Sequence, residues 1–237
     1  MVRAAGDPDE DVREESLKAL QRVASRGDAT ALAIVLASID DEIDDVKLQA
    51  LRSLEHISDV DNAASCQRLV RLLGEDGIDR KLCRAAIEAV AAVTSVGNTS
   101  VISQVLALVK EEQVAVRAAG LRALRHITPK GHEEVAAAAS RLLEDRDDEV
   151  RWAAIRVLRV ASEPGTEAHL AKLRAALEDD DDDVREAALQ AMAALALPGD
   201  PMVLKAAEQC FADVCEDVTC AAIETWQAVA AADQPAE

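Results

Sequence analysis

Residues 147–161 read DDEVRWAAIRVLRVA, and variations on this order of acidic, apolar and basic residues occur seven times along the chain. Each copy contains one apolar anchor, and successive anchors lie 34 residues apart except for one gap of 36. The anchors are Val12, Val46, Leu82, Val116, Val150, Val184 and Val218. Such regular spacing predicts an array of repeated units that pack mainly against their neighbours.

Each anchor lies near the start of an amphipathic helix. In the fifth copy Val150 is followed by Ile155, Leu158 and Ala161, at offsets of 5, 8 and 11 residues. Because a helical residue turns by about 100°, these positions form one apolar stripe. The other copies keep the apolar residues at offsets 5 and 8, so the sequence predicts seven helices with the same buried face.

A second helix is predicted between successive anchors. Its start is marked, in constant register, by Gly27, Asp61, Gly97, Gly131, Gly165 and Gly199. The residues that follow these marks are Asp28, Asn62, Asn98, His132, Thr166 and Asp200, and all but His132 are good N-cap residues. Apolar residues then recur at helical spacing, as at Ile102, Val105 and Val109.

These helices predict one lone helix followed by six helical hairpins. We expect a single domain over residues 1–237, because no linker longer than a turn separates the units. The lone helix takes residues 1–26, the hairpins take 27–60, 61–96, 97–130, 131–164, 165–198 and 199–232, and residues 233–237 form a short tail. Terminal repeats usually need a polar cap, so the two ends are expected to contact a longer array or another protein.

Repeat families with a similar period are distinguished by their motifs. Tetratricopeptide repeats need aromatic residues at fixed places, whereas this chain has no Tyr and one Phe, and it lacks the ankyrin motif Thr-Pro-Leu-His. An acidic residue, Val-Arg or Val-Lys, and then an Ala/Leu-rich helix resembles the HEAT repeats, especially their short, phycobilisome-lyase-like subclass. The matching positions are residues 11–13, 45–47, 149–151 and 183–185, with weaker matches at 116–117 and 217–219.

The resemblance to HEAT repeats covers essentially the whole chain. It implies an all-α fold, a right-handed α-solenoid of about six and a half HEAT-like helical hairpins with a period of 34. Two places depart from the family pattern: Leu82-Cys83 replaces Val-Arg, and the turn at residues 74–78 carries a two-residue insertion.

Net charge restricts the partners. The formal charge of −19 argues against bare nucleic acid or an anionic membrane surface, because the long-range field repels polyanions. No apolar stretch has the length of a membrane span. Acidic residues gather in the turns at 7–11, 40–45, 145–149 and 178–183, where carboxylates can cap the next helix. The spacing lacks the Asp-x-Asp-x-Asp-Gly loop of a calcium site, so we predict no metal and no cofactor.

Five anchors are followed by a basic residue: Arg13, Lys47, Arg117, Arg151 and Arg185. The resemblance to HEAT repeats implies that such arginines pair with acidic residues of the turns and form a ladder between layers. We therefore assign these five residues a structural role rather than a binding role.

The exposed face of the anchor helices supplies the candidate binding site, and the resemblance implies that this face is concave. Offsets of 6 and 9 from the fourth and fifth anchors place four arginines there, one helix turn from an aromatic residue at offset 2. The set is Arg122, Arg125, Trp152, Arg156 and Arg159. Arg and Trp are common in binding hot spots, and Arg forms paired hydrogen bonds with carboxylate or phosphate, so the set predicts a site for an acidic or phosphorylated segment of a protein.

A structural explanation of the same residues stays open. Trp152 and Arg156 are four residues apart and can stack on each other, while Glu88 and Glu186 on flanking units can neutralise the remaining charge.

Cysteine and histidine usage gives no catalytic constellation. Five cysteines without Cys-x-x-Cys spacing, and no apolar leader, favour an intracellular reducing compartment, either cytoplasm or nucleus, with a plastid left open. The histidines are scattered, and no nucleophile motif or phosphate-cradling glycine loop occurs. We therefore expect a non-catalytic protein-interaction scaffold or adaptor, a subunit of a larger assembly. The alternative is an accessory subunit of a bilin-lyase-like or other modifying enzyme, which holds a chromophore or a modified side chain in the groove.

Overall fold

The computed structural model describes residues 4–231, which form thirteen α-helices and three short 3-10 helices and contain no strand. The chain divides into two compact units, the first ending at Ile127 and the second beginning at Thr128. The predicted all-α array of helical hairpins is confirmed in both units.

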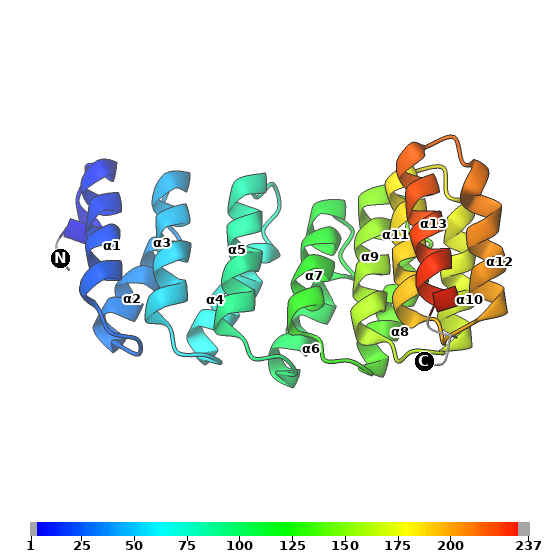
Figure 1. Ribbon diagram of the computed structural model, residues 1–237. Helices are drawn as coiled ribbons and strands as arrows, with labels where there is room; N and C mark the ends of the chain where they lie inside the picture. The colour runs from blue at the N-terminus through cyan, green and yellow to red at the C-terminus, as the bar shows by residue number, and fades with distance from the viewer. Residues whose placement is uncertain (1–3, 232–237) are drawn as a thin grey trace. The chain divides into compact units, whose positions relative to one another are not determined.

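In the first unit, the anchor helices form one layer and the intervening helices form a second (Figure 1). The anchor layer packs in the order α1, α3, α5, α7, and each of α2, α4 and α6 packs against the anchor helix that follows it. The elements are η1 (Ala4–Gly6), α1 (Glu10–Val23), α2 (Ala29–Ser38), α3 (Asp44–Ile57), α4 (Ala63–Leu73), α5 (Arg80–Val93), α6 (Thr99–Leu108) and α7 (Val114–Ile127).

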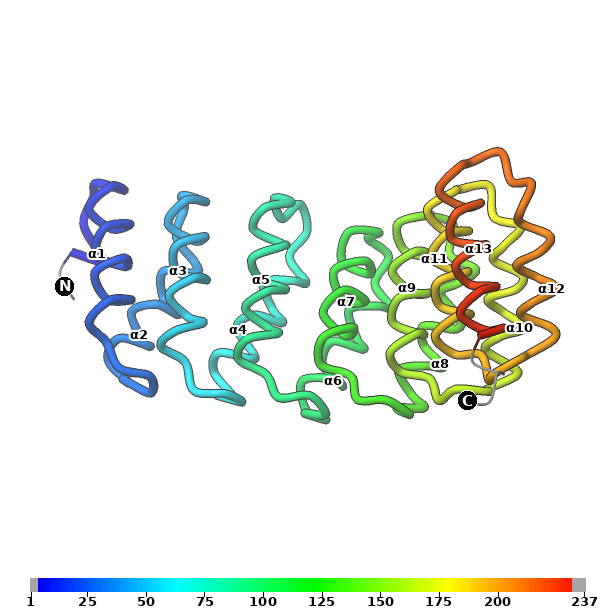
Figure 2. The backbone as a smooth tube through the Cα atoms, in the orientation of Figure 1, coloured from blue at the N-terminus to red at the C-terminus, as the bar shows by residue number. Residues whose placement is uncertain are grey.

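The second unit repeats this two-layer plan, as the backbone tube in Figure 2 also shows. Helices α9, α11 and α13 pack side by side, and α8, α10 and α12 form the other layer. The elements are α8 (Glu133–Leu142), α9 (Asp148–Ala161), α10 (Glu167–Ala175), η2 (Ala176–Glu178), α11 (Asp182–Leu195), α12 (Pro201–Gln209), η3 (Cys210–Ala212) and α13 (Glu216–Ala231).

The core follows the predicted apolar stripe. The anchors from Val46 to Val218 are buried, as are the residues at offset 8 from the anchors of the first six copies. Small residues let the helices approach closely: at Gly120 in α7, an added Cβ would lie 3.0 Å from Val109 Cγ1 and 3.1 Å from Leu108 Cβ. Burial of apolar surface between layers is the main stabilising contribution, at about 25 cal/mol per Å².

The turn before each second-layer helix also joins neighbouring repeats. Gly27, at φ 81°, donates its N–H to the carbonyl oxygen of Ile57 at the end of the next anchor helix, at 2.8 Å. Asp61 takes the same place with φ 60° and donates to Val93 at 2.7 Å. Positive φ is the reason that glycine occupies five of the six marks. The glycine marks therefore fix the register between repeats as well as starting a helix.

Two N-cap expectations need correction. His132 does act as a side-chain cap, because its Nδ1 accepts from the N–H of Val135 at 3.4 Å. Thr166 occupies the cap position of α10 without a side-chain cap bond, because its hydroxyl donates to the carbonyl of Glu163 at 2.7 Å instead.

Each range predicted for a hairpin contains one second-layer helix and one anchor helix. The predicted tail at 233–237 lies outside the described residues. That all the repeats form a single domain stays a prediction.

Candidate functional site

The predicted binding residues of the second unit lie on one helix. Trp152, Arg156 and Arg159 all come from α9, where the 3.6-residue period places Trp152 and Arg156 one turn apart. The guanidinium carbon of Arg156 lies 4.4 Å from the centroid of the Trp152 ring. Such cation–π contacts stabilise by about 0.5–1 kcal/mol at exposed sites. The stacking considered in the structural explanation is therefore present, and it holds the Arg156 side chain in place.

Arg159 is exposed at the C-terminal end of α9. Among residues 4–231, its side chain takes part in no hydrogen bond or ion pair. The charge of this guanidinium is therefore available to a partner.

The predicted binding residues of the first unit, Arg122 and Arg125, are half-buried on α7. In the described part of the chain no hydrogen bond or ion pair involves the side chain of Arg125. The structure thus gives each unit an arginine-bearing helix face of its own.

The carboxylates expected to neutralise these arginines have other partners. Glu88 Oε1 accepts from Arg84 Nε at 2.9 Å, one turn earlier on α5. Glu186 Oε1 accepts from Gln190 Nε2 at 2.7 Å on α11. Both contacts stay within one helix.

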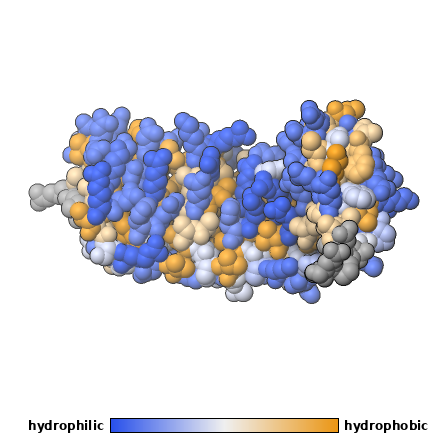
Figure 3. All heavy atoms as spheres, in the orientation of Figure 1, coloured by the Kyte–Doolittle hydropathy of each residue, from blue (hydrophilic) through white to orange (hydrophobic). Residues whose placement is uncertain are grey.

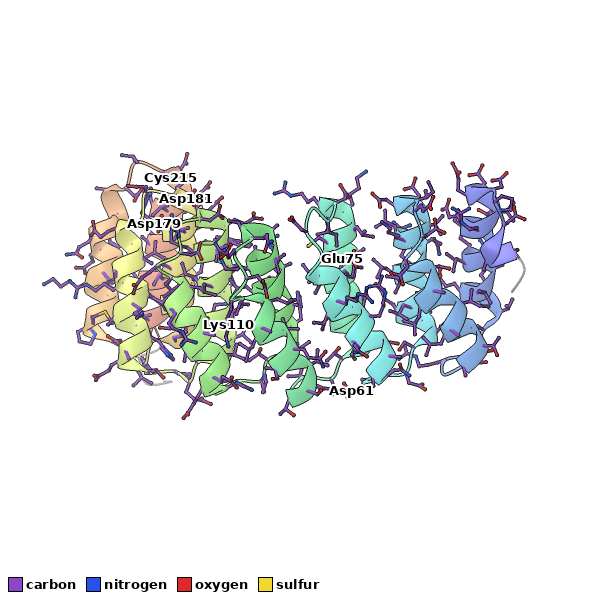
Figure 4. The ribbon with its side chains drawn as sticks, turned by 180° about the vertical axis from the view of Figure 1, so that it is seen from behind. Asp61, Glu75, Lys110, Asp179, Asp181 and Cys215 are labelled. Carbon is purple, nitrogen blue, oxygen red and sulfur yellow. The ribbon has the colours of Figure 1, made fainter. Side chains whose placement is uncertain are left out.

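The residues predicted as a ladder form bidentate pairs in three places. Arg151 reaches from α9 to the turn before α11, where its Nε and Nη2 donate to Asp179 Oδ2 and Oδ1, both at 2.7 Å. Its Nη1 donates to the carbonyl oxygens of Asp145 at 3.0 Å and Arg146 at 3.2 Å. One guanidinium therefore ties together the turns that precede two successive anchor helices, and Figure 4 shows Asp179 in the second of these turns.

Arg185 and Arg13 repeat this geometry. Arg185 donates to both carboxylate oxygens of Asp213 at 2.9 Å, and Arg13 donates to those of Asp41 at 2.7 and 2.9 Å. In every case the acceptor lies 28 residues after the arginine. Each carboxylate also accepts from a backbone N–H two residues on, as Asp213 does from Cys215 at 2.9 Å.

These contacts stabilise the ionised carboxylates. The Arg13 guanidinium beside Asp41 lowers the pKa of that carboxyl, and the Arg185 guanidinium does the same to the pKa of Asp213. Burial on its own would raise the pKa of Asp179, but the hydrogen bonds from Arg151 and from the N–H of Asp181 lower it below its usual value.

The other two predicted ladder residues differ. Arg117 Nη1 donates to the carbonyls of Glu111 at 3.0 Å and Glu112 at 2.6 Å, which are the contacts to its own turn. Lys47 pairs with Asp44 at 3.0 Å inside α3 instead of bridging two layers. The insertion at 74–78 explains the difference, because Gly77 occupies the place that Asp41 and Asp179 take in their turns.

A family model of HEAT repeats matches residues 78–159 and 135–226. The chain belongs to the HEAT-repeat family. No curated protein matches the sequence.

Solved structures show the same fold at low identity. The archaeal HEAT-like repeats protein from Thermococcus onnurineus NA1 matches with 12% identity and a TM-score of 0.61, covering 94% of each chain. A chain from a structure of Kap95p with RanGDP matches with 12% identity and a TM-score of 0.74, covering 96% of this chain and 35% of that one. An engineered protein matches with 19% identity and a TM-score of 0.51, covering 96% and 67%.

The ladder acceptors of this HEAT-repeat chain could have been found in the sequence. An aspartate lies five residues before the anchor at Asp7, Asp41, Asp145, Asp179 and Asp213. We expected turn carboxylates to pair with the arginines without identifying these positions, although their recurrence in register with Val-Arg is the signal.

A groove of about 920 Å³ lies in the second unit of this HEAT-repeat chain. Ala171 and Ala175 of α10 and Met202 and Ala206 of α12 contribute to its lining. Arg185 and Asp213 also line it, but they pair with each other, so the groove gains little net charge from them.

The described residues provide no catalytic or metal centre. Within 4–231 no group of three His, Cys, Asp or Glu side chains could hold a metal ion. His56 Nδ1 lies 3.1 Å from Gln21 Nε2, and burial, together with Lys172, lowers the pKa of His169. None of the helices in the described part of the HEAT-repeat chain is long and apolar enough to cross a membrane.

Proposed function

We propose that this HEAT-repeat chain is a protein-interaction scaffold whose arginine-bearing anchor helices bind acidic or phosphorylated segments of partner proteins. The observation that carries the proposal is the surface of α9, where Trp152 holds Arg156 and the neighbouring Arg159 is exposed without an ion pair in the described chain. Arginine donates paired hydrogen bonds to carboxylate and phosphate oxygens, and its planar charge tolerates contact with an aromatic ring.

The charge of the chain supports the selectivity of such a surface. With a formal net charge of −19, the molecule repels acidic ligands at long range, so a local cationic face is needed to hold them. A protein segment also suits an extended repeat surface, on which several weak contacts add along one ligand. Kap95p, a structural neighbour with the same fold, is described as a binding partner of RanGDP.

The test uses a fluorescein-labelled phosphoserine/glutamate peptide and a peptide of the same length with Ser and Gln in its place. We expect the acidic peptide to bind more tightly, and its affinity to fall as salt increases. Arg156→Glu with Arg159→Glu should weaken binding by about tenfold or more, or ~1.4 kcal/mol, in fluorescence anisotropy. Arg122→Glu with Arg125→Glu tests the face on α7 separately.

Arg174→Glu is the matched control, because Arg174 is an exposed arginine of α10 in the other layer. Equal weakening by Arg174→Glu, with circular dichroism unchanged in both variants, would show that only net charge matters and would reject the proposed surface.

A further inference from the structure

The last described repeat has an apolar end face formed by Leu204, Phe211, Ile223 and Trp226. Phe211 is 40% exposed and Ile223 is 42% exposed, and Leu204 and Trp226 are half-buried. We call these four residues the end face. Figure 3 shows apolar surface, in orange, over α13 and the turn that precedes it.

The preceding repeat shows what normally covers these positions. The residues that lie 34 positions earlier are Leu170, Leu177, Leu189 and Met192, and their exposures are 1%, 8%, 0% and 0%. Helix α13 packs against α11, and α12 packs against α10, so the following hairpin covers this surface. In the described chain no element covers the end face in the same way.

Carboxylates surround the end face. Residues 199–231 contain six acidic residues and one basic residue, Lys205. Glu216, Asp217 and Glu224 are exposed on α13, and none of the described residues forms an ion pair with them. The adjoining Glu186 reports the same local field, because burial and the charges of Asp217, Asp183, Asp182 and Glu224 raise its pKa.

A second copy of this chain fits the end face poorly. Each anchor helix packs against the preceding one through offsets 3 and 7, which are Ala187 and Ala191 in α11 and are both buried. In α1 the residue at offset 3 is Glu15, which is exposed and lies beside Glu14 and Asp11. Stacking α1 of a second copy on α13 would therefore place carboxylates against apolar and acidic surface, which is unfavourable.

We propose that the end face binds an amphipathic helix of another protein, one with small or aliphatic residues on its buried side and Lys or Arg on both flanks. This helix would take the position that α13 takes on α11. The apolar side would cover Phe211 and Ile223, and the flanking cations would pair with Glu216 and Glu224. The end face lies apart from the arginines of α9 and selects the opposite charge, so the two proposals fail independently.

The experiment uses two labelled helical peptides as long as α13, which has 16 residues. The first carries Ala and Leu on one face and Lys elsewhere, and the second has Glu in place of every Lys. The wild-type chain should bind the Lys peptide and not the Glu peptide. Phe211→Ser with Ile223→Ser should weaken binding by about tenfold or more, and Glu216→Gln with Glu224→Gln should weaken it by a smaller factor.

The matched control is Val12→Ser with Val23→Ser, since these valines of α1 are 39% and 63% exposed. This control should leave the affinity within about twofold of the wild type. Three results would overturn the proposal: no binding of the Lys peptide, equal loss of binding in the control, or a wild-type dimer in sedimentation that Phe211→Ser with Ile223→Ser disperses. The last result would identify a second copy as the occupant.

Discussion

Helices α9, α11 and α13 and helices α3, α5 and α7 are each three successive anchor helices within one unit, but their charged contacts differ. In the first group a bidentate Arg–Asp pair joins each step, through Arg151 and then Arg185. In the second group the corresponding residues are Lys47, which pairs inside its own helix, and Cys83, which carries no positive charge.

Both groups nevertheless keep the same backbone contacts between repeats. The turn N–H groups of Gly165 and Gly199 donate to Leu195 and Val229, at 2.7 and 3.0 Å. In the other group the turn N–H groups of Asp61 and Gly97 donate to Val93 and Ile127, at 2.7 and 2.8 Å. Apolar burial and these backbone bonds therefore suffice to stack the repeats. The Arg–Asp ladder strengthens the stack but does not define it.

The largest effect should come from breaking the ladder at Arg151. Arg151→Ala removes both hydrogen bonds to Asp179 and leaves a largely buried carboxylate, whose side chain is 11% exposed, without its cation. We expect a loss of about 1–2 kcal/mol, which lowers the melting temperature by about 3–6 °C in a chain of this size. Thermal unfolding followed by circular dichroism measures the change.

Arg159→Ala on the same helix is the control. Arg159 is exposed and has no ion pair in the described chain, so its removal should change the melting temperature by less than about 1 °C. Equal destabilisation by the two variants would contradict the division between ladder arginines and binding arginines.

An intermediate effect should appear in acid. The pKa of Asp213 is lower in the folded chain than in the unfolded chain, because Arg185 stabilises its charge. The resulting stability is fully present above the unfolded value of about pH 4, and it is lost as the pH falls through the folded pKa. Asp213→Asn removes this contribution, so its melting temperature should fall less steeply below about pH 4 than that of the wild type.

Asp217→Asn is suited as the control for the acid experiment, because Asp217 is exposed and has no ion pair in the described residues. It should keep the wild-type slope. If Asp213→Asn kept that slope as well, the Arg185–Asp213 pair would contribute nothing measurable to folding.

Local periodicity explains what could be predicted from the sequence. The offsets 5 and 8 from each anchor depend only on helix geometry, so they predicted the helices and their buried faces. The bidentate partners depend on how far an arginine reaches into the next repeat, and the Lys47 prediction failed to allow for Gly77 in the inserted turn. The end face around Phe211 and Ile223 was not predicted, since exposure depends on which neighbouring helix is present. The residues of the arginine faces were predicted, but their ligand stays a proposal.

The smallest effect should come from building a ladder step where none exists. Cys83 takes the arginine position on α5, and Glu111 takes the acceptor position 28 residues later, in the turn before α7. Arg117 donates to the carbonyls of Glu111 and Glu112 just as Arg151 donates to those of Asp145 and Arg146, so this turn holds the arginine of its own repeat in the usual way. Cys83→Arg with Glu111→Asp should therefore complete a bidentate pair.

We expect the double variant to gain about 0.5–1 kcal/mol, or about 1–4 °C in melting temperature, because one new partly exposed ion pair is worth no more than this. The two single variants complete a double-mutant cycle, which separates the new pair from the loss of Cys83 and from the change in the turn. A favourable coupling energy between the two substitutions would mean that the α5–α7 step differs from α9–α11 only in its side chains. A coupling of zero would mean that the spacing between α5 and the turn before α7 no longer matches the reach of an arginine, and the difference between the two groups of helices would then lie in the backbone.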